Sequence, residues 1–175
     1  MKSSGKYGKF QMTEEELARF CQYEANQATL ITLRKTGTPF GIPLGFYYDG
    51  DYFYVTIGKD RTAVKRIRND PRVCLTIASP IPHPPKFVIA EGISEEIPDP
   101  ENEISRKLLM YGPPDKWDKL PIDPEKWFPN WVAFGRVVFR IRVTKLTTYD
   151  HTKDPETERD VNGRGPRMPE DVVPG

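Results

Sequence analysis

The strongest constraint on this chain is a succession of short β-rich segments, each closed by turn residues. Residues 28–34 run into Thr-Gly-Thr-Pro, and residues 40–48 run into Asp-Gly-Asp, which are turn sequences between antiparallel strands. Residues 52–57 alternate in character along the chain, as expected of a strand with one buried face. These features predict an antiparallel meander in the first third of the chain.

The rest of the chain predicts three further strands, at residues 73–78, 86–95 and 131–145. In the second of these, Gly92 indicates a bulge or a close backbone contact. Short helices are expected at residues 13–24, 62–69 and 101–111, and the proline-rich, aromatic stretch 112–130 is assigned neither state. Six strands with short helices predict a mainly β fold with α decoration. Because an open apolar sheet would expose adhesive edges, we expect it to close into a barrel.

The first helix has a clear start signal, because Thr13 and Glu16 have the spacing of a capping box. In the helix at 62–69, Val64 and Ile67 are expected to face inward, and the Asp-Pro pair that follows should end it.

Composition excludes several classes of protein. The chain has 175 residues, with 26 basic against 25 acidic residues and a net charge of +1, which does not favour nucleic acid or an anionic membrane as partner. No run approaches the ~18 apolar residues of a membrane-spanning helix. Cys21 and Cys74 form no Cys-x-x-Cys pair, and the polar start does not resemble a signal peptide. We therefore expect a cytoplasmic protein with free thiols.

The chain is predicted to form one domain over residues 13–150. Residues 1–12 are expected to be a flexible leader. Residues 151–175 are highly charged and poor in apolar side chains, so burial cannot offset their ordering entropy. We expect this tail to be disordered or docked on a partner.

Residues 54–66 carry the most informative chemistry, a strand followed by a glycine-bearing loop and the start of a helix. Helix N-terminal amides attract anions, and Thr62 adds a hydroxyl near that terminus. The basic residues of this stretch are Lys59, Arg61, Lys65 and Arg66. The pattern indicates a phosphate site; the alternatives are a solvated basic helix, or contacts to nucleic-acid phosphates that would show steep salt dependence.

An ordered set of motifs gives the chain a family resemblance. The motifs lie at residues 28–33, 37–39, 42–46, 54–56, 64–73, 88–92 and 148–151. The most specific is the helix-to-strand run that ends in Asn-Asp-Pro-Arg-Val. Over roughly residues 13–152 the chain resembles the pyridoxamine 5'-phosphate oxidase-like, FMN-binding split-barrel superfamily. Within it, the chain is most similar to the actinobacterial flavin/deazaflavin oxidoreductases.

The resemblance implies a six-stranded antiparallel split β-barrel that forms a homodimer, with two cofactors at the subunit interface. The cofactor would be FMN or the deazaflavin coenzyme F-420, the latter slightly favoured. Its phosphate would face Lys59, Arg61, Thr62 and Lys65; its ring would lie beside Ile42, Pro43 and Leu44; and its ribityl chain would lie near Thr56 and Ile57. The cofactor would exchange hydride with a small planar substrate. The alternative is a non-catalytic flavin- or haem-binding protein on the same barrel.

Vitamin B6 phosphate oxidation is disfavoured within this superfamily. The strand expected beneath the ring, residues 41–48, carries no charge, and the chain has Thr-Tyr-Asp-His where those enzymes have an arginine-rich motif.

Several other residues remain open at this stage. Arg72, Arg140 and Arg142 could hold the polyglutamate tail of F-420. The row Arg136, Arg140 and Arg142 on one strand face could form salt bridges across a dimer or contact an acidic cofactor tail. His83 is read as an exposed loop residue that could touch a substrate or haem, and His151 as structural or interfacial. An aromatic group could line a cleft or form a satellite core; it comprises Trp117, Trp127, Phe128 and Trp131. Two histidines and two separate cysteines give a metal site little support.

Overall fold

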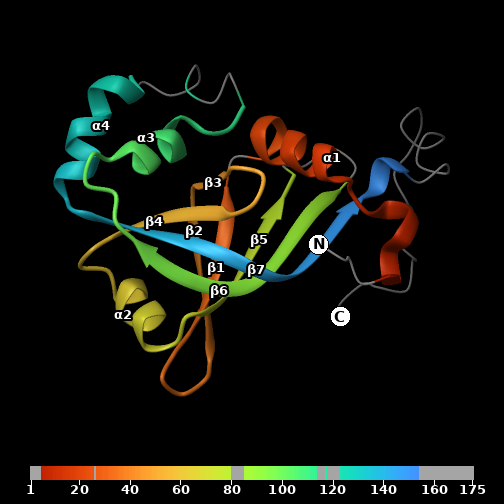
Figure 1. Ribbon diagram of the computed structural model, residues 1–175, viewed down its shortest axis with the longest axis horizontal. Coiled ribbons are helices and arrows are strands. Elements are labelled where there is room, and N and C mark those ends of the chain that lie inside the picture. The colour runs from red at the N-terminus through yellow and green to blue at the C-terminus, as the bar shows by residue number, and fades with distance from the viewer. Residues whose placement is uncertain (1–4, 26, 80–84, 114–116, 118–122, 154–175) are drawn as a thin grey trace, which may run out of the picture.

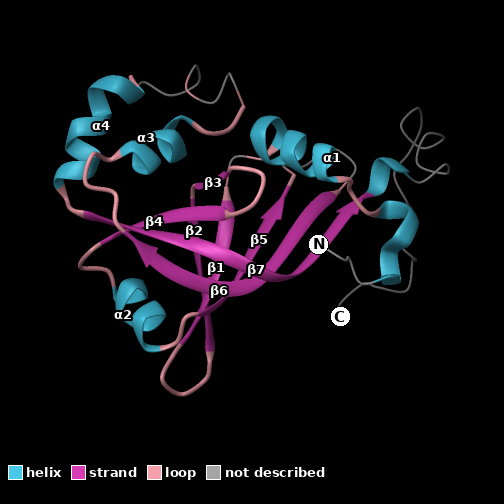
Figure 2. Cartoon of the chain, viewed as in Figure 1, coloured by secondary structure: helices cyan, strands magenta, loops and turns pink. Residues whose placement is uncertain are grey.

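A computed structural model describes residues 5–25, 27–79, 85–113, 117 and 123–153. One curled antiparallel sheet of seven strands forms its centre, in the order β2-β1-β5-β6-β7-β4-β3 (Figures 1 and 2). The strands are β1 (Ala28–Leu33), β2 (Pro39–Leu44), β3 (Phe46–Tyr48), β4 (Phe53–Gly58), β5 (Arg72–Ala78), β6 (Lys86–Ile97) and β7 (Arg136–Asp150). The helices are α1 (Glu14–Arg19), α2 (Thr62–Asn69), α3 (Glu103–Met110) and α4 (Pro124–Ala133), and a π-helical turn, η2 (Phe20–Glu24), extends α1.

The expectation of six strands is wrong because the segment 40–48 divides at Gly45. Its first part, β2, pairs with β1, and its second part, β3, pairs with β4. These two short strands lie at opposite ends of the sheet order, yet one residue separates them along the chain. That connection bends the sheet round on itself and leaves a split where β2 and β4 diverge.

The pairing of β6 with β7 contains the bulge expected at Gly92. The register shifts between Glu91 and Gly92, and a Cβ atom added at Gly92 would lie 2.5 Å from the carbonyl oxygen of Arg142. A side chain cannot fit there, so the two longest strands depend on a glycine at this position.

The core lies inside the curl of the sheet. Its largest fully buried side chains include Phe20, Phe53, Phe139, Leu30 and Leu75. The predicted alternation on β4 is confirmed at Phe53, Val55 and Ile57, although Thr56 on the other face is buried as well. On α2, Val64 and Ile67 are buried as expected.

The C-terminal third differs from its prediction. Residues 131–133 belong to α4, and the last strand starts at Arg136 and runs to Asp150. Asp123 caps α4, accepting a bond from the amide of Glu125, and Pro124 occupies its first turn, where a missing N–H costs nothing. Gly135, at φ +66°, then turns the chain out of the helix and into β7.

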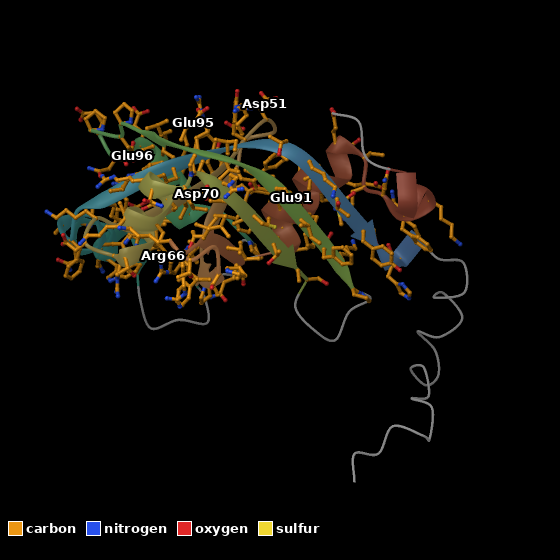
Figure 3. The ribbon with its side chains drawn as sticks, turned by 90° about the horizontal axis from the view of Figure 1, so that it is seen from below. Asp51, Arg66, Asp70, Glu91, Glu95 and Glu96 are labelled. Carbon is orange, nitrogen blue, oxygen red and sulfur yellow. The ribbon has the colours of Figure 1, made fainter. Side chains whose placement is uncertain are left out.

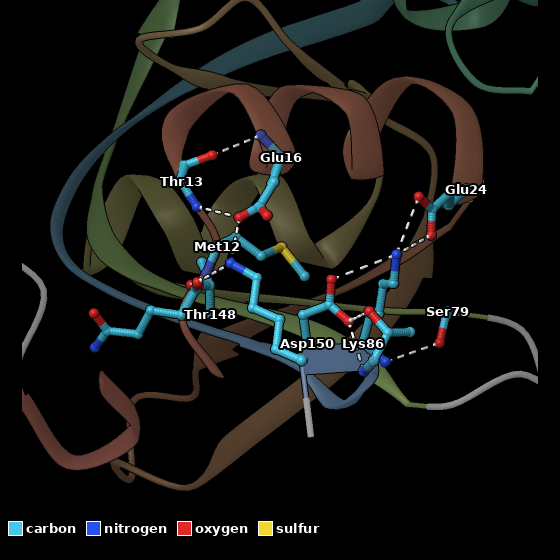
Figure 4. A network of polar contacts seen from close by, with 11 residues as sticks. Met12, Thr13, Glu16, Glu24, Ser79, Lys86, Thr148 and Asp150 are labelled. Carbon is cyan, nitrogen blue, oxygen red and sulfur yellow. Dashed lines mark hydrogen bonds and ion pairs between the residues drawn. The ribbon is translucent and has the colours of Figure 1, made fainter. Parts of the chain in front are cut away.

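Polar contacts tie the N-terminal helices to the end of β7 (Figure 4). The capping box of α1 is present, since Thr13 and Glu16 exchange hydrogen bonds. The amide of Met12 donates to Thr148 Oγ1 at 2.9 Å. Lys86 Nζ lies 2.9 Å from Glu24 Oε2 and also pairs with the buried carboxylate of Asp150. Residues 5–10 of the predicted leader form a 3₁₀ helix, in which the Phe10 ring packs against Tyr149.

No helix in the described ranges is both long and apolar enough to cross a membrane.

Candidate functional site: an arginine-lined cleft in the split of the sheet

The site is a cleft of about 850 Å³ at the split between β2 and β4, beside the start of α2. Strand β4 pairs with β7 over its whole length, whereas its pairing with β3 covers only the residues from Phe53 to Val55. From Thr56 to Gly58 the other edge of β4 is therefore open towards the cleft. Its lining comes from β2, the end of β4, the first turns of α2 and the corner between α4 and β7, and comprises Phe40, Ile42, Pro43, Leu44, Thr56, Ile57, Gly58, Asp60, Arg61, Thr62, Ala63, Arg66, Phe134 and Arg136.

Seven of the nine predicted cofactor residues line this one cleft. They are Ile42, Pro43, Leu44, Thr56, Ile57, Arg61 and Thr62. Lys59 and Lys65 are exposed and are not among the lining residues. The backbone N–H of Lys59 donates to the carbonyl of Gly135 at 3.0 Å, and the side chain of Lys59 lies against the same glycine. The roles predicted for the nine residues stay predictions.

Arg61 is the N-cap of α2, and Thr62 is its first helical residue. The Arg61 side chain makes no capping bond, and first-turn amides have no partner within a helix. The N-terminus of α2 thus presents backbone N–H donors, the hydroxyl of Thr62 and the guanidinium of Arg61 beside the cleft. This arrangement suits an anion.

Arg136 is the main residue whose place in this cleft the sequence pattern did not predict. The sequence grouped it with Arg140 and Arg142 on one face of β7, but its side chain reaches across to β4. Its guanidinium donates to Thr56 Oγ1 at 2.5 Å and to the Thr56 carbonyl at 2.9 Å. It also lies 3.9 Å from the centre of the Trp131 ring. Burial, together with the nearby charge of Arg61, lowers the pKa of Arg136 to about 10.

Arg66 was noted as part of the basic run, and the structure turns it into the cleft. Its guanidinium lies 4.2 Å from the centre of the Phe40 ring, which Arg34 approaches at 4.6 Å. Its Nη1 atom is buried and has no hydrogen-bond partner among the described residues. A buried guanidinium nitrogen without an acceptor is costly, so this atom is suited to an incoming oxygen.

The cleft arginines differ from most arginines elsewhere in the molecule. Those paired with carboxylates within the chain are Arg68, Arg72, Arg106, Arg140 and Arg142. Within the described residues, Arg61, Arg66 and Arg136 have no such ion pair, and Asp60 is the only carboxylate in the lining. Figure 3 shows Arg66 on the opposite side of the view from Asp51 and Glu95. The cleft therefore has an excess of positive charge.

The outer arginines, Arg72, Arg140 and Arg142, form ion pairs within the chain, whereas the sequence suggested a cofactor tail or a dimer contact for them. Arg140 and Arg142 both pair with Glu95, and Arg72 pairs with Asp70, at 2.6 Å. These contacts lie within one chain and already occupy the charges proposed for a cofactor tail or for a dimer contact.

The remaining candidates have local roles or lie outside the description. His151 Nδ1 is 2.9 Å from the hydroxyl of Tyr149, which is a structural contact. His83 lies outside the described residues. Cys21 and Cys74 are both free, and burial raises the pKa of Cys21 to about 12. In the aromatic group, Phe128 is buried while Trp127 is 37% exposed.

Comparison with known proteins agrees with this architecture. The sequence model described as pyridoxamine 5'-phosphate oxidase matches residues 13–110, more than half of the chain. A search of curated proteins found no match. The crystal structure of the conserved hypothetical protein Rv2991 from Mycobacterium tuberculosis superposes with a TM-score of 0.67 and 19% identity, covering 99% of this chain and 100% of that one.

Two further solved structures share the fold at lower similarity. An F-420 reductase has a TM-score of 0.56 and 22% identity, over 74% of this chain and 94% of its own. A heme binding protein from Mycobacterium smegmatis has a TM-score of 0.53 and 16% identity, over 82% of this chain and 60% of its own. With its curled antiparallel sheet and the family match over residues 13–110, the chain belongs to the pyridoxamine 5'-phosphate oxidase-like family of split-barrel proteins.

Proposed function

We propose that the protein is an oxidoreductase that holds FMN or the deazaflavin coenzyme F-420 in the cleft between β2 and β4. The observation that carries the proposal is the buried, unpartnered Nη1 of Arg66, in a cleft whose arginines have no carboxylate partners among the described residues. Positive charge gathered at a helix N-terminus fits a phosphate. A volume of about 850 Å³ is within the usual range for a cofactor pocket.

The residues present would divide the work of binding. Arg61, Arg66 and the first turn of α2 would hold the phosphate. Ile42, Pro43 and Leu44 form an uncharged wall on which a ring system can pack. The cleft-facing edge of β4 at residues 56–58 has no strand paired beside it in the described chain. Its backbone groups, other than the Thr56 and Gly58 carbonyls that already accept hydrogen bonds, can meet the polar rim of such a ring.

Arg136 would fix the floor of this site. It locks the Thr56 carbonyl and hydroxyl in place, and it keeps a positive charge beside the cleft without a carboxylate partner in the described chain. A bound flavin or deazaflavin would supply the hydride chemistry, while the chain would bind it, orient it and exclude water on one face.

The similar structures support this proposal at the level of fold, and their names point to two kinds of protein, an F-420 reductase and a heme binding protein. The chemistry of the lining supports the first kind. None of the described lining residues is a histidine, cysteine, methionine or tyrosine, the side chains that ligate haem iron. The cleft therefore favours a phosphate-anchored ring over haem.

The decisive experiment is a pair of titrations of the purified protein, with FMN and with F-420, followed by absorbance and fluorescence. Saturable binding of either cofactor supports the proposal, and the tighter one identifies it. Arg61→Ala should weaken binding by about 1.5–3 kcal/mol, the value of a hydrogen bond to a charged group. Arg68→Ala, which removes an exposed arginine of α2 that pairs with Glu96 outside the lining, should have a much smaller effect. Failure of both cofactors to bind at high micromolar concentration would reject the proposal.

We also propose that a second copy of the chain packs on the outer face of β1, β5 and β6. That face has an apolar hollow of about 450 Å³, lined in part by Thr29, Thr76 and Ile89. Pro43 lines both this hollow and the arginine cleft, so a second copy there would border the cofactor. Sedimentation equilibrium should give twice the mass of the chain, and Ile89→Arg should give a monomer. A monomeric wild type at 50–100 µM would exclude this arrangement.

A further inference from the structure

The corner between α4 and β7 places an exposed aromatic ring on the rim of the cleft. Phe134 is 75% exposed, the most exposed large hydrophobic residue in the described chain, and it lines the cleft. The other two large exposed hydrophobics, Tyr23 and Trp127, do not. Leaving a phenyl ring in water is unfavourable, so a ligand that covers it gains free energy.

Contacts from two sides hold this corner in place. The carbonyl of Gly135 accepts the backbone N–H of Lys59, and the Lys59 side chain packs so closely that a Cβ atom at Gly135 would lie 2.7 Å from its Cδ. On the other side, Arg136 is fixed between the Trp131 ring and Thr56. Phe134 lies along the chain between Trp131 and Gly135, which these contacts hold, so its backbone is presented to the cleft in a defined position.

The corner belongs to neither part of the site that the cofactor would use. The phosphate donors come from α2 and the apolar wall comes from β2, whereas Phe134 ends α4. Figure 1 shows α2 and α4 on opposite sides of the end of the sheet where β4 meets β7. A cofactor held between β2 and α2 would leave Phe134 on its uncovered side.

We infer that Phe134 is a specificity residue that stacks on the substrate, and that the substrate is a planar conjugated molecule. This inference rests on the proposed cofactor site and deepens it. Aromatic rings gain from offset or edge-to-face contact with another π system, and a puckered or aliphatic molecule cannot make that contact. Phe134 would take no part in the hydride transfer itself.

The test is equilibrium binding of duroquinone to the oxidised protein loaded with the cofactor that it binds, measured by calorimetry. Duroquinone is planar, and its four methyl groups block addition to the thiol of Cys74. We expect saturable binding, weakened about tenfold in Phe134→Ala and kept within about twofold in Phe134→Tyr. Trp127→Ala, which removes another exposed ring from α4, should match the wild type. Cyclohexane-1,4-dione, with the same two carbonyls on a puckered ring, should not compete.

The cofactor titration separates the possible failures. If neither FMN nor F-420 binds the wild type, the proposed function fails and the inference falls with it. If a cofactor binds but duroquinone does not, or Phe134→Ala binds it as the wild type does, the inference alone is overturned. It is also overturned if Phe134→Ala weakens cofactor binding as much as duroquinone binding, because the ring would then belong to the cofactor wall.

Discussion

Arg66 offers the sharpest test of the cleft as an anion site, through the substitution Arg66→Ala. In the free protein its guanidinium packs on Phe40 and one buried nitrogen lacks an acceptor. A phosphate oxygen bound there would gain one charge-assisted hydrogen bond, about 1.5–3 kcal/mol. The substitution should therefore raise the Kd for the cofactor by about tenfold to about 150-fold.

The same change should have little effect on folding. It removes a cation–π contact worth about 0.5–1 kcal/mol, but it also removes a buried donor that has no partner among the described residues. The free energy of unfolding, measured by urea denaturation without cofactor, should change by less than about 1 kcal/mol. A large loss of affinity with little loss of stability is the signature of a ligand contact.

Arg68→Ala is the matched control, because Arg68 lies on the same helix and is exposed. It forms a two-bond ion pair with Glu96 and does not line the cleft. This variant should bind the cofactor as the wild type does. Arg66→Lys, which keeps the charge but not the planar fork, should be intermediate. Equal Kd values for Arg66→Ala, Arg68→Ala and the wild type in a fluorescence titration would refute the reasoning.

Three further predictions concern stability and ligand linkage. Gly92→Ala should lower the free energy of unfolding, measured by urea denaturation, by roughly 1–3 kcal/mol, because the new Cβ would lie 2.5 Å from a carbonyl oxygen. Gly45→Ala is the control and should lower it much less, because its Cβ would make an ordinary contact at 3.5 Å. Hydrogen bonds from Arg72 lower the pKa of Asp70 to about 2. The contribution of the ionised Asp70 to folding stability is therefore complete above its ordinary pKa of about 3.9, and it is lost as the pH falls through about 2. Asp70→Asn and Arg72→Gln should both flatten the fall of Tm between pH 4 and pH 2, and an unchanged slope in both would contradict the assignment. Cofactor at about 100 times its Kd should stabilise the wild type by about 2.7 kcal/mol in thermal melts, and an absence of any shift would show that the folded state does not bind it.

The features that the sequence by itself determined are those set by neighbouring residues. The capping box at Thr13 and Glu16, the inward face of α2 and the bulge at Gly92 follow from helical spacing, side-chain chemistry and the absence of a side chain. The basic start of α2 is likewise visible in the sequence, whereas the cleft residues on β2 and β4 were predicted only through the family resemblance.

Only the tertiary structure decided features that depend on partners distant along the chain. Gly45 divides one extended segment because its first half pairs with β1 and its second half pairs with β4. Arg136 enters the cleft because it bonds to Thr56, 80 residues away, and no local periodicity carries that information. Arg140 and Arg142 find a carboxylate on the adjacent strand, Glu95 of β6, while the cleft arginines find none in the described chain. Local propensity therefore gave the elements, and long-range pairing decided which charges were left for a ligand.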